Sequence, residues 1–248
     1  MRPEILLLDC GGTLSWPPFE RVNAILTELR GISFPVDKAY EGFYRSGHAL
    51  DSYLRKHNKY PVDNNLELNH WVYEQGMELT GFKGAWTIEC TMELMRREGR
   101  MGNWDYTFPW VAQSLVRLRE AGLRMGLVSN SDGRVKELLE GLGYAQYFET
   151  IVDSYIEKIS KPDPRLYYIA LERMGRGDLV SQAKLAATGA APKVDVLYVG
   201  DNLRCDLDGS ERAGMKGLLI DPFNLYDFIV EEKRIKDMTE LADMLCEP

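Results

Sequence analysis

Short apolar runs recur along the chain, with longer stretches of helical periodicity between them. We predict strands at residues 4–8, 123–128, 148–152, 194–199 and 217–220. The run at residues 4–8 is continuously apolar rather than alternating, which indicates a strand covered on both faces, as in a parallel sheet. Helices are predicted at residues 111–121, 133–142, 163–174, 206–213 and 238–245, with a partly helical connection at 175–193. This alternation predicts an α/β fold with a doubly wound parallel sheet.

A long stretch after the first strand departs from this alternation. From Phe19 to about Met101 apolar residues recur at helical spacing and form no convincing strand. The positions that carry this pattern are Val22, Ile25, Leu26 and Leu29, and then Trp71, Val72, Glu74, Gly76, Glu78 and Leu79. We therefore predict an α/β core of residues 1–15 and 106–248, with residues 16–105 inserted as an all-helical cap domain.

Composition narrows the class of protein. The 248 residues carry a net charge of −8, which argues against nucleic acid as the main partner, because binding its backbone requires clustered cations. The first apolar run is too short for a secretory leader or a membrane span. The cysteines are far apart, without the paired spacing of a zinc site: Cys10, Cys90, Cys205 and Cys246. A soluble protein in a reducing cytoplasm is expected, and nothing indicates its oligomeric state.

Polar residues suited to phosphate chemistry lie at or just after the ends of four predicted strands. In open α/β sheets the ligand site lies beyond the carboxyl ends of the strands. Each residue alone has an ordinary structural explanation, such as a turn or a helix cap. Their joint occurrence at strand ends favours a site instead. The candidates are Asp9, Thr13, Ser129, Asn130, Lys161, Asp201 and Asp206.

These four segments resemble the signature motifs of the haloacid dehalogenase superfamily. Residues 9–14, with the sequence DCGGTL, are similar to the family's first motif, D-x-D-G-T-L. Ser129 matches the second motif and Lys161 the third, while residues 200–206 (GDNLRCD) match the acidic fourth motif. The resemblance covers the whole core, and the helical insert corresponds to the family's cap domain.

The resemblance implies a magnesium-dependent phosphatase acting on a small phosphorylated molecule. Asp9 is then the nucleophile and forms an aspartyl-phosphate. It further implies that Mg²⁺ is held by Asp9, the Gly11 carbonyl and Asp201, with Asp206 acting through water. The phosphoryl oxygens are expected to contact Ser129, Asn130, Lys161 and the turn formed by Gly11, Gly12 and Thr13.

Gly11 departs from the family pattern, since phosphatases of this family usually carry there a second Asp that acts as general acid and base. Loss of such a group typically costs about 10²–10⁴-fold in rate. Three explanations stay open: a replacement acid from the cap or a water molecule, a different scissile bond, or a weak or inactive relative that binds metal and phosphate. If the missing carboxylate limits the rate, Gly11→Asp should raise phosphatase activity.

The alternatives make different demands on the sequence. Phosphonate hydrolysis needs a cap lysine, and none stands out among Lys38, Lys56, Lys59 and Lys83. The dehalogenase branch uses no Mg²⁺, whereas Gly200 and Asp201 form a metal-type motif. A phospho-receiver signalling domain would need its acidic pair near the first strand and would have no large insert.

Aromatic and histidine residues of the insert are further site candidates. Helix packing is the favoured role for Tyr44, Tyr53, Trp71 and Tyr73. The histidines lack metal-ligand spacing: His48, His57 and His70. Trp104 and Trp110 bracket the predicted hinge between cap and core, a stretch that should flex if the cap closes over the site.

Overall fold

A computed structural model of the chain describes residues 2–31, 33–56, 93, 96–97 and 104–246. Its centre is a six-stranded, all-parallel sheet in the order β3-β2-β1-β4-β5-β6. The strands are β1 (Ile5–Leu8), β2 (Arg124–Ser129), β3 (Thr150–Asp153), β4 (Val196–Gly200), β5 (Lys216–Ile220) and β6 (Arg234–Ile235). The predicted doubly wound sheet is confirmed. Strand β6 was not predicted, because two residues are too few to form an apolar run.

Helices alternate with these strands, mostly where the periodicity predicts them. They are α5 (Pro109–Glu120), α6 (Val135–Gly141), α7 (Ser154–Glu157), α8 (Pro164–Arg173), α9 (Gly177–Ala187), α10 (Asp208–Arg212) and α11 (Met238–Cys246), with short turns η1 (Ala145–Tyr147) and η3 (Glu231–Lys233). The helix predicted at 206–213 instead begins as a π-helical turn, η2 (Leu203–Leu207). Asn202 starts this turn, because its side chain accepts a hydrogen bond from the Cys205 amide at 2.7 Å.

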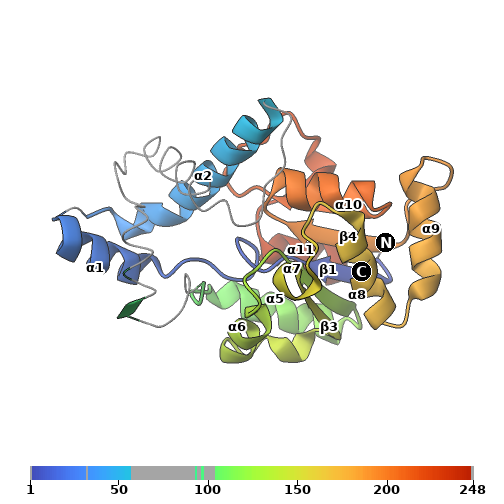
Figure 1. Cartoon of the computed structure of the whole chain (residues 1–248), viewed down its shortest axis with the longest axis horizontal. Coiled ribbons are helices and arrows are strands. Elements are labelled where there is room, and N and C mark those ends of the chain that lie inside the picture. The colour runs from blue at the N-terminus through green and yellow to red at the C-terminus, as the bar shows by residue number, and fades with distance from the viewer. Residues whose placement is uncertain (1, 32, 57–92, 94–95, 98–103, 247–248) are drawn as a thin grey trace.

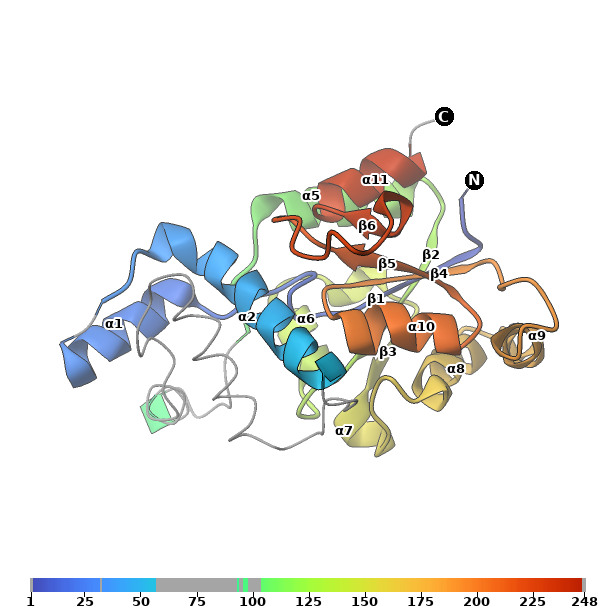
Figure 2. The same cartoon turned by 90° about the horizontal axis from the view of Figure 1, so that it is seen from above.

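The helices form one layer on each face of the sheet (Figure 2). Helices α5 and α11 cover one face, while α8, α9 and α10 cover the other. Successive residues of β1 alternate between the two cores: Leu6 and Leu8 pack on the α5 side, Ile5 and Leu7 on the α8 side. All four side chains are fully buried, which explains the continuous apolar run.

The described part of the insert is helical, as predicted. Helices α1 (Phe19–Arg30) and α2 (Val36–Lys56) extend to one side of the core, away from both chain termini (Figure 1). The second helical pattern, at 71–79, lies outside the described residues, so the division at residues 16 and 105 stays a prediction. Within the described ranges no helix is both long and apolar enough to cross a bilayer.

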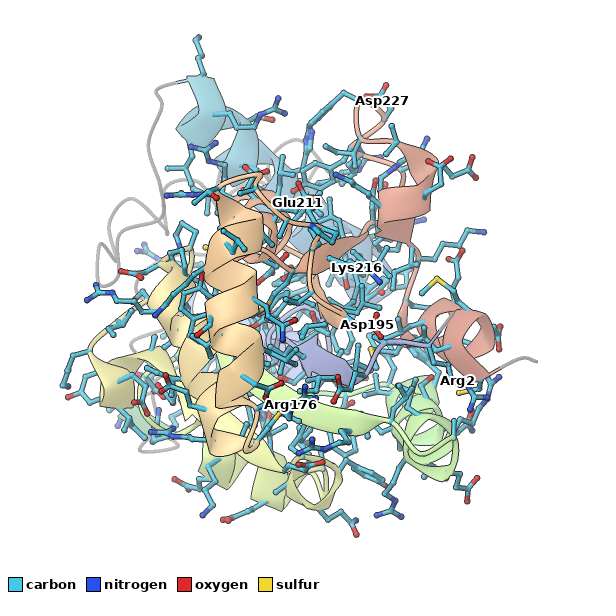
Figure 3. The ribbon with its side chains drawn as sticks, turned by 90° about the vertical axis from the view of Figure 1, so that its right-hand side faces the viewer. Arg2, Arg176, Asp195, Glu211, Lys216 and Asp227 are labelled. Atoms are coloured by element: carbon cyan, nitrogen blue, oxygen red, sulfur yellow. The ribbon has the colours of Figure 1, made fainter. Side chains whose placement is uncertain are left out.

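The sheet order places a ligand site beside β1. The chain runs from β1 through β2 to β3 on one side, and then crosses over to β4 on the other side of β1. Such a topological switch point opens a crevice at the carboxyl ends of the strands. The opposite, amino-terminal edge carries solvent-exposed charges (Figure 3). There Lys216 bonds Asp195 at 2.9 Å, and Arg2 reaches the Leu245 carbonyl at 2.7 Å.

Candidate active site

The residues predicted from the four strand ends lie close together. Asp9 follows β1, and its amide donates to the Val199 carbonyl on β4 at 2.9 Å. Asp201 follows β4, and Asp206 returns to the same point through η2. One carboxylate oxygen from each of Asp9, Asp201 and Asp206 lies within 4.8 Å of the others. The parallel pairing of β1 and β4 therefore builds an acidic centre from residues almost 200 positions apart.

Lys161 lies inside this acidic centre. Its Nζ donates to Asp9 Oδ1 at 2.8 Å and to Asp206 Oδ1 at 2.7 Å, and the residue is only 2% exposed. Burial alone would lower the pKa of Lys161, but attraction by Asp206 and Asp9 outweighs burial and raises the pKa well above its ordinary value. The ammonium is therefore charged at neutral pH.

One lysine does not neutralise three carboxylates. Burial, followed by repulsion from Asp206 and Asp9, raises the pKa of Asp201 well above its usual range. Burial also raises the pKa of Asp9, against the attraction of Lys161. Such a site stabilises an added cation, and its donors are all hard carboxylate oxygens, the ligands that Mg²⁺ prefers. The residues present thus fit a divalent hard cation.

The glycine loop after β1 is pressed against this centre. Gly12 has a φ of +70°, and a Cβ there would lie 2.2 Å from Asp201 Oδ2, so only glycine fits. Its amide donates to the Ser15 carbonyl at 2.9 Å, and the Thr13 amide donates to the Cys10 carbonyl at 3.3 Å. In this conformation the loop itself uses both amides, and their binding to phosphate stays a prediction.

The Thr13 side chain is a better candidate than its amide. Thr13 is 1% exposed, and no partner for its hydroxyl is found among the described residues. A buried hydroxyl without a partner costs free energy unless a ligand or water satisfies it. This hydroxyl is therefore available to a bound phosphoryl group.

The end of β2 and the loop after it contain one candidate ligand, Ser129, and one residue that supports Lys161, Asn130. Ser129 ends β2 and is buried. The side chain of Asn130 accepts from the Lys161 amide at 2.8 Å and donates to the Lys161 carbonyl at 3.1 Å. The side-chain amide therefore supports the Lys161 backbone, and phosphate binding by Asn130 stays a prediction. Asp153, which the sequence analysis missed, holds the same loop by accepting from the amides of Gly133 and Val135.

Trp104 covers Gly11, the position that lacks the expected carboxylate. A Cβ built on Gly11 would lie 3.0 Å from Cζ3 and 3.2 Å from Cε3 of the Trp104 indole. The indole is held in turn by Phe43 of α2, with ring centroids 5.6 Å apart at 79°. Trp104 was expected only to flank a hinge, and its contact with the site was not foreseen.

Residues of α2 also reach the site. Tyr44 is buried against Tyr40, as the packing interpretation predicts, and its hydroxyl also donates to the Gly12 carbonyl at 2.6 Å. His48 packs edge-on against Tyr226. Lys38 and Lys56 are exposed. The other insert candidates lie outside the described side chains: Tyr53, His57, Lys59, His70, Trp71, Tyr73 and Lys83.

Asp51 is a second buried acid that α2 brings to the acidic loop. Its Oδ2 accepts from the Leu203 amide at 3.0 Å and from the Tyr226 hydroxyl at 2.6 Å. Its other oxygen, Oδ1, is buried without a partner within the described structure. Burial raises the pKa of Asp51 to about 7. This residue therefore links the insert to the loop between Asp201 and Asp206.

Asp51→Asn should remove a pH dependence of stability. The pKa of Asp51 is about 7 in the folded state, against 3.8 for the free side chain. Folding then takes up a proton between pH 4 and 7, so the wild type loses stability across this window as pH rises. The free energy of unfolding of Asp51→Asn, minus that of the wild type, should increase by about 2 kcal/mol from pH 5 to 7 and level off above pH 8. Urea unfolding tests this, and parallel pH profiles would contradict it.

Fold and site together define the class of protein: a doubly wound α/β protein whose acidic centre lies at the topological switch point of its sheet. The sequence profile of the haloacid dehalogenase-like hydrolases matches residues 4–214. The chain therefore belongs to the haloacid dehalogenase-like hydrolase family.

Individual relatives agree with this assignment. The chain is 26% identical over 236 residues to human haloacid dehalogenase-like hydrolase domain-containing protein 3, which covers 90% of this chain and 84% of the relative. It is 34% identical over 110 residues to the glyceraldehyde 3-phosphate phosphatase of Methanopyrus kandleri, covering 44% of this chain and 40% of the relative.

Solved structures share the fold along the whole chain. The putative hydrolase YfnB from Bacillus subtilis, bound to magnesium, superposes with a TM-score of 0.60 at 18% identity and covers 99% of both chains. The L-2-haloacid dehalogenase RSc1362 superposes with a TM-score of 0.60 at 16% identity over 100% of both chains. At these identities the likeness shows the fold alone, because related folds carry different chemistry.

Proposed function

We propose that this chain is a Mg²⁺-dependent phosphatase that hydrolyses a small phosphorylated metabolite through an aspartyl-phosphate at Asp9. The observation that carries the proposal is the position of Asp9: at the tip of β1, bonded to Lys161 at 2.8 Å and within 4.8 Å of two further carboxylates. A carboxylate held beside an ammonium, in a site that attracts a cation, suits nucleophilic attack on an anionic phosphate ester.

Each residue has a defined part in this proposal. A carboxylate oxygen of Asp9 forms a bond to phosphorus while the bond to the leaving oxygen breaks, and that oxygen takes a proton from water. A second water molecule then attacks the acyl-phosphate, which releases inorganic phosphate and restores Asp9. The hydroxyls of Ser129 and Thr13 donate to the phosphoryl oxygens. Bound Mg²⁺ would lower the charge repulsion between substrate and site.

The same residues define where the ion would be held. Asp9, Asp201 and the Gly11 carbonyl would bind it directly. Asp206 would act through water, because its own oxygens already accept from Lys161 Nζ and from the Asn202 amide at 2.9 Å. The role of Asp206 is thereby mainly to hold Lys161 and the acidic loop.

The class of substrate is supported by the relatives. Partial matches include a glyceraldehyde 3-phosphate phosphatase and, at 31% identity over 115 residues, a phosphoserine phosphatase of Thermus thermophilus. Both names specify small phosphorylated molecules. Asp201 beside Asp9 favours a metal-dependent phosphatase over haloacid hydrolysis, which the resemblance associates with a site that uses no Mg²⁺.

A substrate screen tests this proposal. Small phosphate esters, phosphonates and 2-haloacids are incubated with the protein in Mg²⁺ or in EDTA. We expect release of inorganic phosphate from phosphate esters in Mg²⁺ only. Halide release without metal would support a dehalogenase instead. Release of neither phosphate nor halide from any substrate would support an inactive relative.

The position of Trp104 changes what is expected of Gly11→Asp. A side chain at residue 11 meets the indole at 3.0 Å, so the single variant is expected to gain no phosphatase activity, in contrast to the expectation from sequence. Combining Gly11→Asp with Trp104→Ala opens the space for the carboxylate. We expect the double variant to hydrolyse an alkyl phosphate about 10²-fold faster than Trp104→Ala alone. Steady-state kinetics of the four proteins checks this, and an equal gain in the single Gly11→Asp variant would contradict it.

A further inference from the structure

Tyr198 lies beneath the acidic centre and has no role in the signature motifs. It belongs to β4, is fully buried, and packs edge-on against Tyr167 with ring centroids 5.1 Å apart. In the sequence it is one member of an apolar run, which favours a core residue. Its hydroxyl group, however, requires a partner at this depth.

The hydroxyl of Tyr198 makes two hydrogen bonds that fix its direction. It donates its single proton to the Val128 carbonyl on β2 at 2.8 Å. Because that proton is used, only the oxygen lone pairs are left to face Lys161 Nζ, which lies 2.9 Å away and donates to them. Tyr198 is therefore an acceptor anchored between two strands of the sheet.

This contact completes the hydrogen bonding of Lys161. An ammonium group has three protons. They are directed at Asp9 Oδ1 at 2.8 Å, at Asp206 Oδ1 at 2.7 Å and at Tyr198 Oη at 2.9 Å. All three acceptors belong to the protein, so in this arrangement no proton is left for a substrate.

We infer that Tyr198 is a positioning residue that holds the Lys161 ammonium against the nucleophile and away from the substrate. Lys161 then acts by fixing Asp9 and Asp206 and by its charge, and does not grip the phosphoryl oxygens as the family resemblance implies. The phosphoryl oxygens would then accept from hydroxyl groups such as that of Thr13, which is buried without a partner among the described residues. The inference deepens the proposed function and rests on it only for its kinetic consequence.

The structural part is tested without any turnover. In the metal-free wild type, the ¹⁵N-labelled ammonium of Lys161, assigned by its loss in Lys161→Arg, should give a resolved NMR signal, because its protons are fully bonded and exchange slowly with water. In Tyr198→Phe that exchange should accelerate about tenfold to hundredfold, the factor for losing one hydrogen bond to a charged group. Tyr144→Phe is the matched control: this buried tyrosine also loses a hydroxyl contact, to Thr107 at 3.0 Å, and should leave exchange unchanged.

The kinetic part separates positioning from substrate contact. With an aryl phosphate and Mg²⁺, Tyr198→Phe should lower kcat about tenfold or more without raising KM, whereas Tyr144→Phe should change neither. A raised KM with unchanged kcat would overturn the inference, as would rapid exchange of the Lys161 ammonium in the wild type. The exchange rate of the Lys161 ammonium in the wild type tests the inference even if Tyr198→Phe does not fold. If the wild type hydrolyses no phosphate, the proposed function fails, while the exchange measurement still tests the position of Lys161.

Discussion

Asp9→Asn is expected to lower kcat for an aryl phosphate by about four orders of magnitude or more, the range seen when a covalent nucleophile is removed. The amide oxygen of asparagine still accepts the hydrogen bond that Lys161 donates to Asp9 at 2.8 Å, so the fold should survive. The amide, however, is a poor nucleophile and bears no charge. Steady-state phosphate release, measured together with the thermal transition, separates lost chemistry from lost structure.

Asp132, in the loop after β2, provides a matched control for Asp9→Asn. Asp132 is exposed, and its carboxylate is bonded to Arg134 of the same loop. Asp132→Asn makes the same chemical change close to the site and should keep wild-type turnover. Turnover of Asp9→Asn within about tenfold of the wild type would refute the assignment of Asp9 as nucleophile.

Lys161→Met is expected to impair both activity and folding. The ammonium is bonded to Asp9 and Asp206 at 2.8 and 2.7 Å in a site almost closed to water. Removing one partner of a buried ion pair leaves uncompensated charge and destabilises by about 3–5 kcal/mol. Methionine preserves the length of the side chain, so the loss reflects charge and hydrogen bonding more than volume. Urea unfolding at pH 8 measures the loss.

The pH dependence of the stability loss in Lys161→Met tests whether unpaired carboxylates cause it. Without Lys161 the buried carboxylates need protons to be neutralised, and burial already raises the pKa of Asp9. The free-energy gap between Lys161→Met and the wild type should therefore narrow as pH falls from 8 to 5.

Lys216→Met is the control for Lys161→Met. Lys216 pairs with Asp195 at 2.9 Å at the exposed edge in Figure 3, and its removal should cost about 0–1 kcal/mol at either pH. Equal losses for the two lysine variants would mean that Lys161 does not hold the acidic centre together.

The sheet was predictable because a strand covered on both faces leaves a continuous apolar run. Five of the six strands can be recognised as short, mostly apolar runs, and polar residues at or after four of these runs mark the edge where parallel strands end. The sequence places Asp9 and Asp201 at the same edge of the sheet, and the parallel pairing of β1 and β4 makes them neighbours. The acidic centre therefore follows from local patterns combined with one rule of topology.

The contacts that support the acidic centre could not be predicted from the sequence. The residues that make them have the same sequence pattern as residues that only pack in a strand or on a helix. Tyr198 looks like any residue of a buried strand, and Asp51 like a polar position on an amphipathic helix. Asp51 and Leu203 are separated by 152 positions, and only the fold brings them together. The hydrogen bonds that the Gly12 amide and the Asn130 side chain make within the loops also depend on the fold, and the sequence gives no sign of them.

The central claim, a covalent phosphoryl intermediate on Asp9, is tested most directly by acid-quenching the enzyme during turnover of a phosphate ester in Mg²⁺ and mapping the modified peptide by mass spectrometry. We predict the mass of one added phosphoryl group on the peptide that contains Asp9, and none in Asp9→Asn. A protein that turns over steadily but carries the phosphoryl group on another residue would contradict the claim.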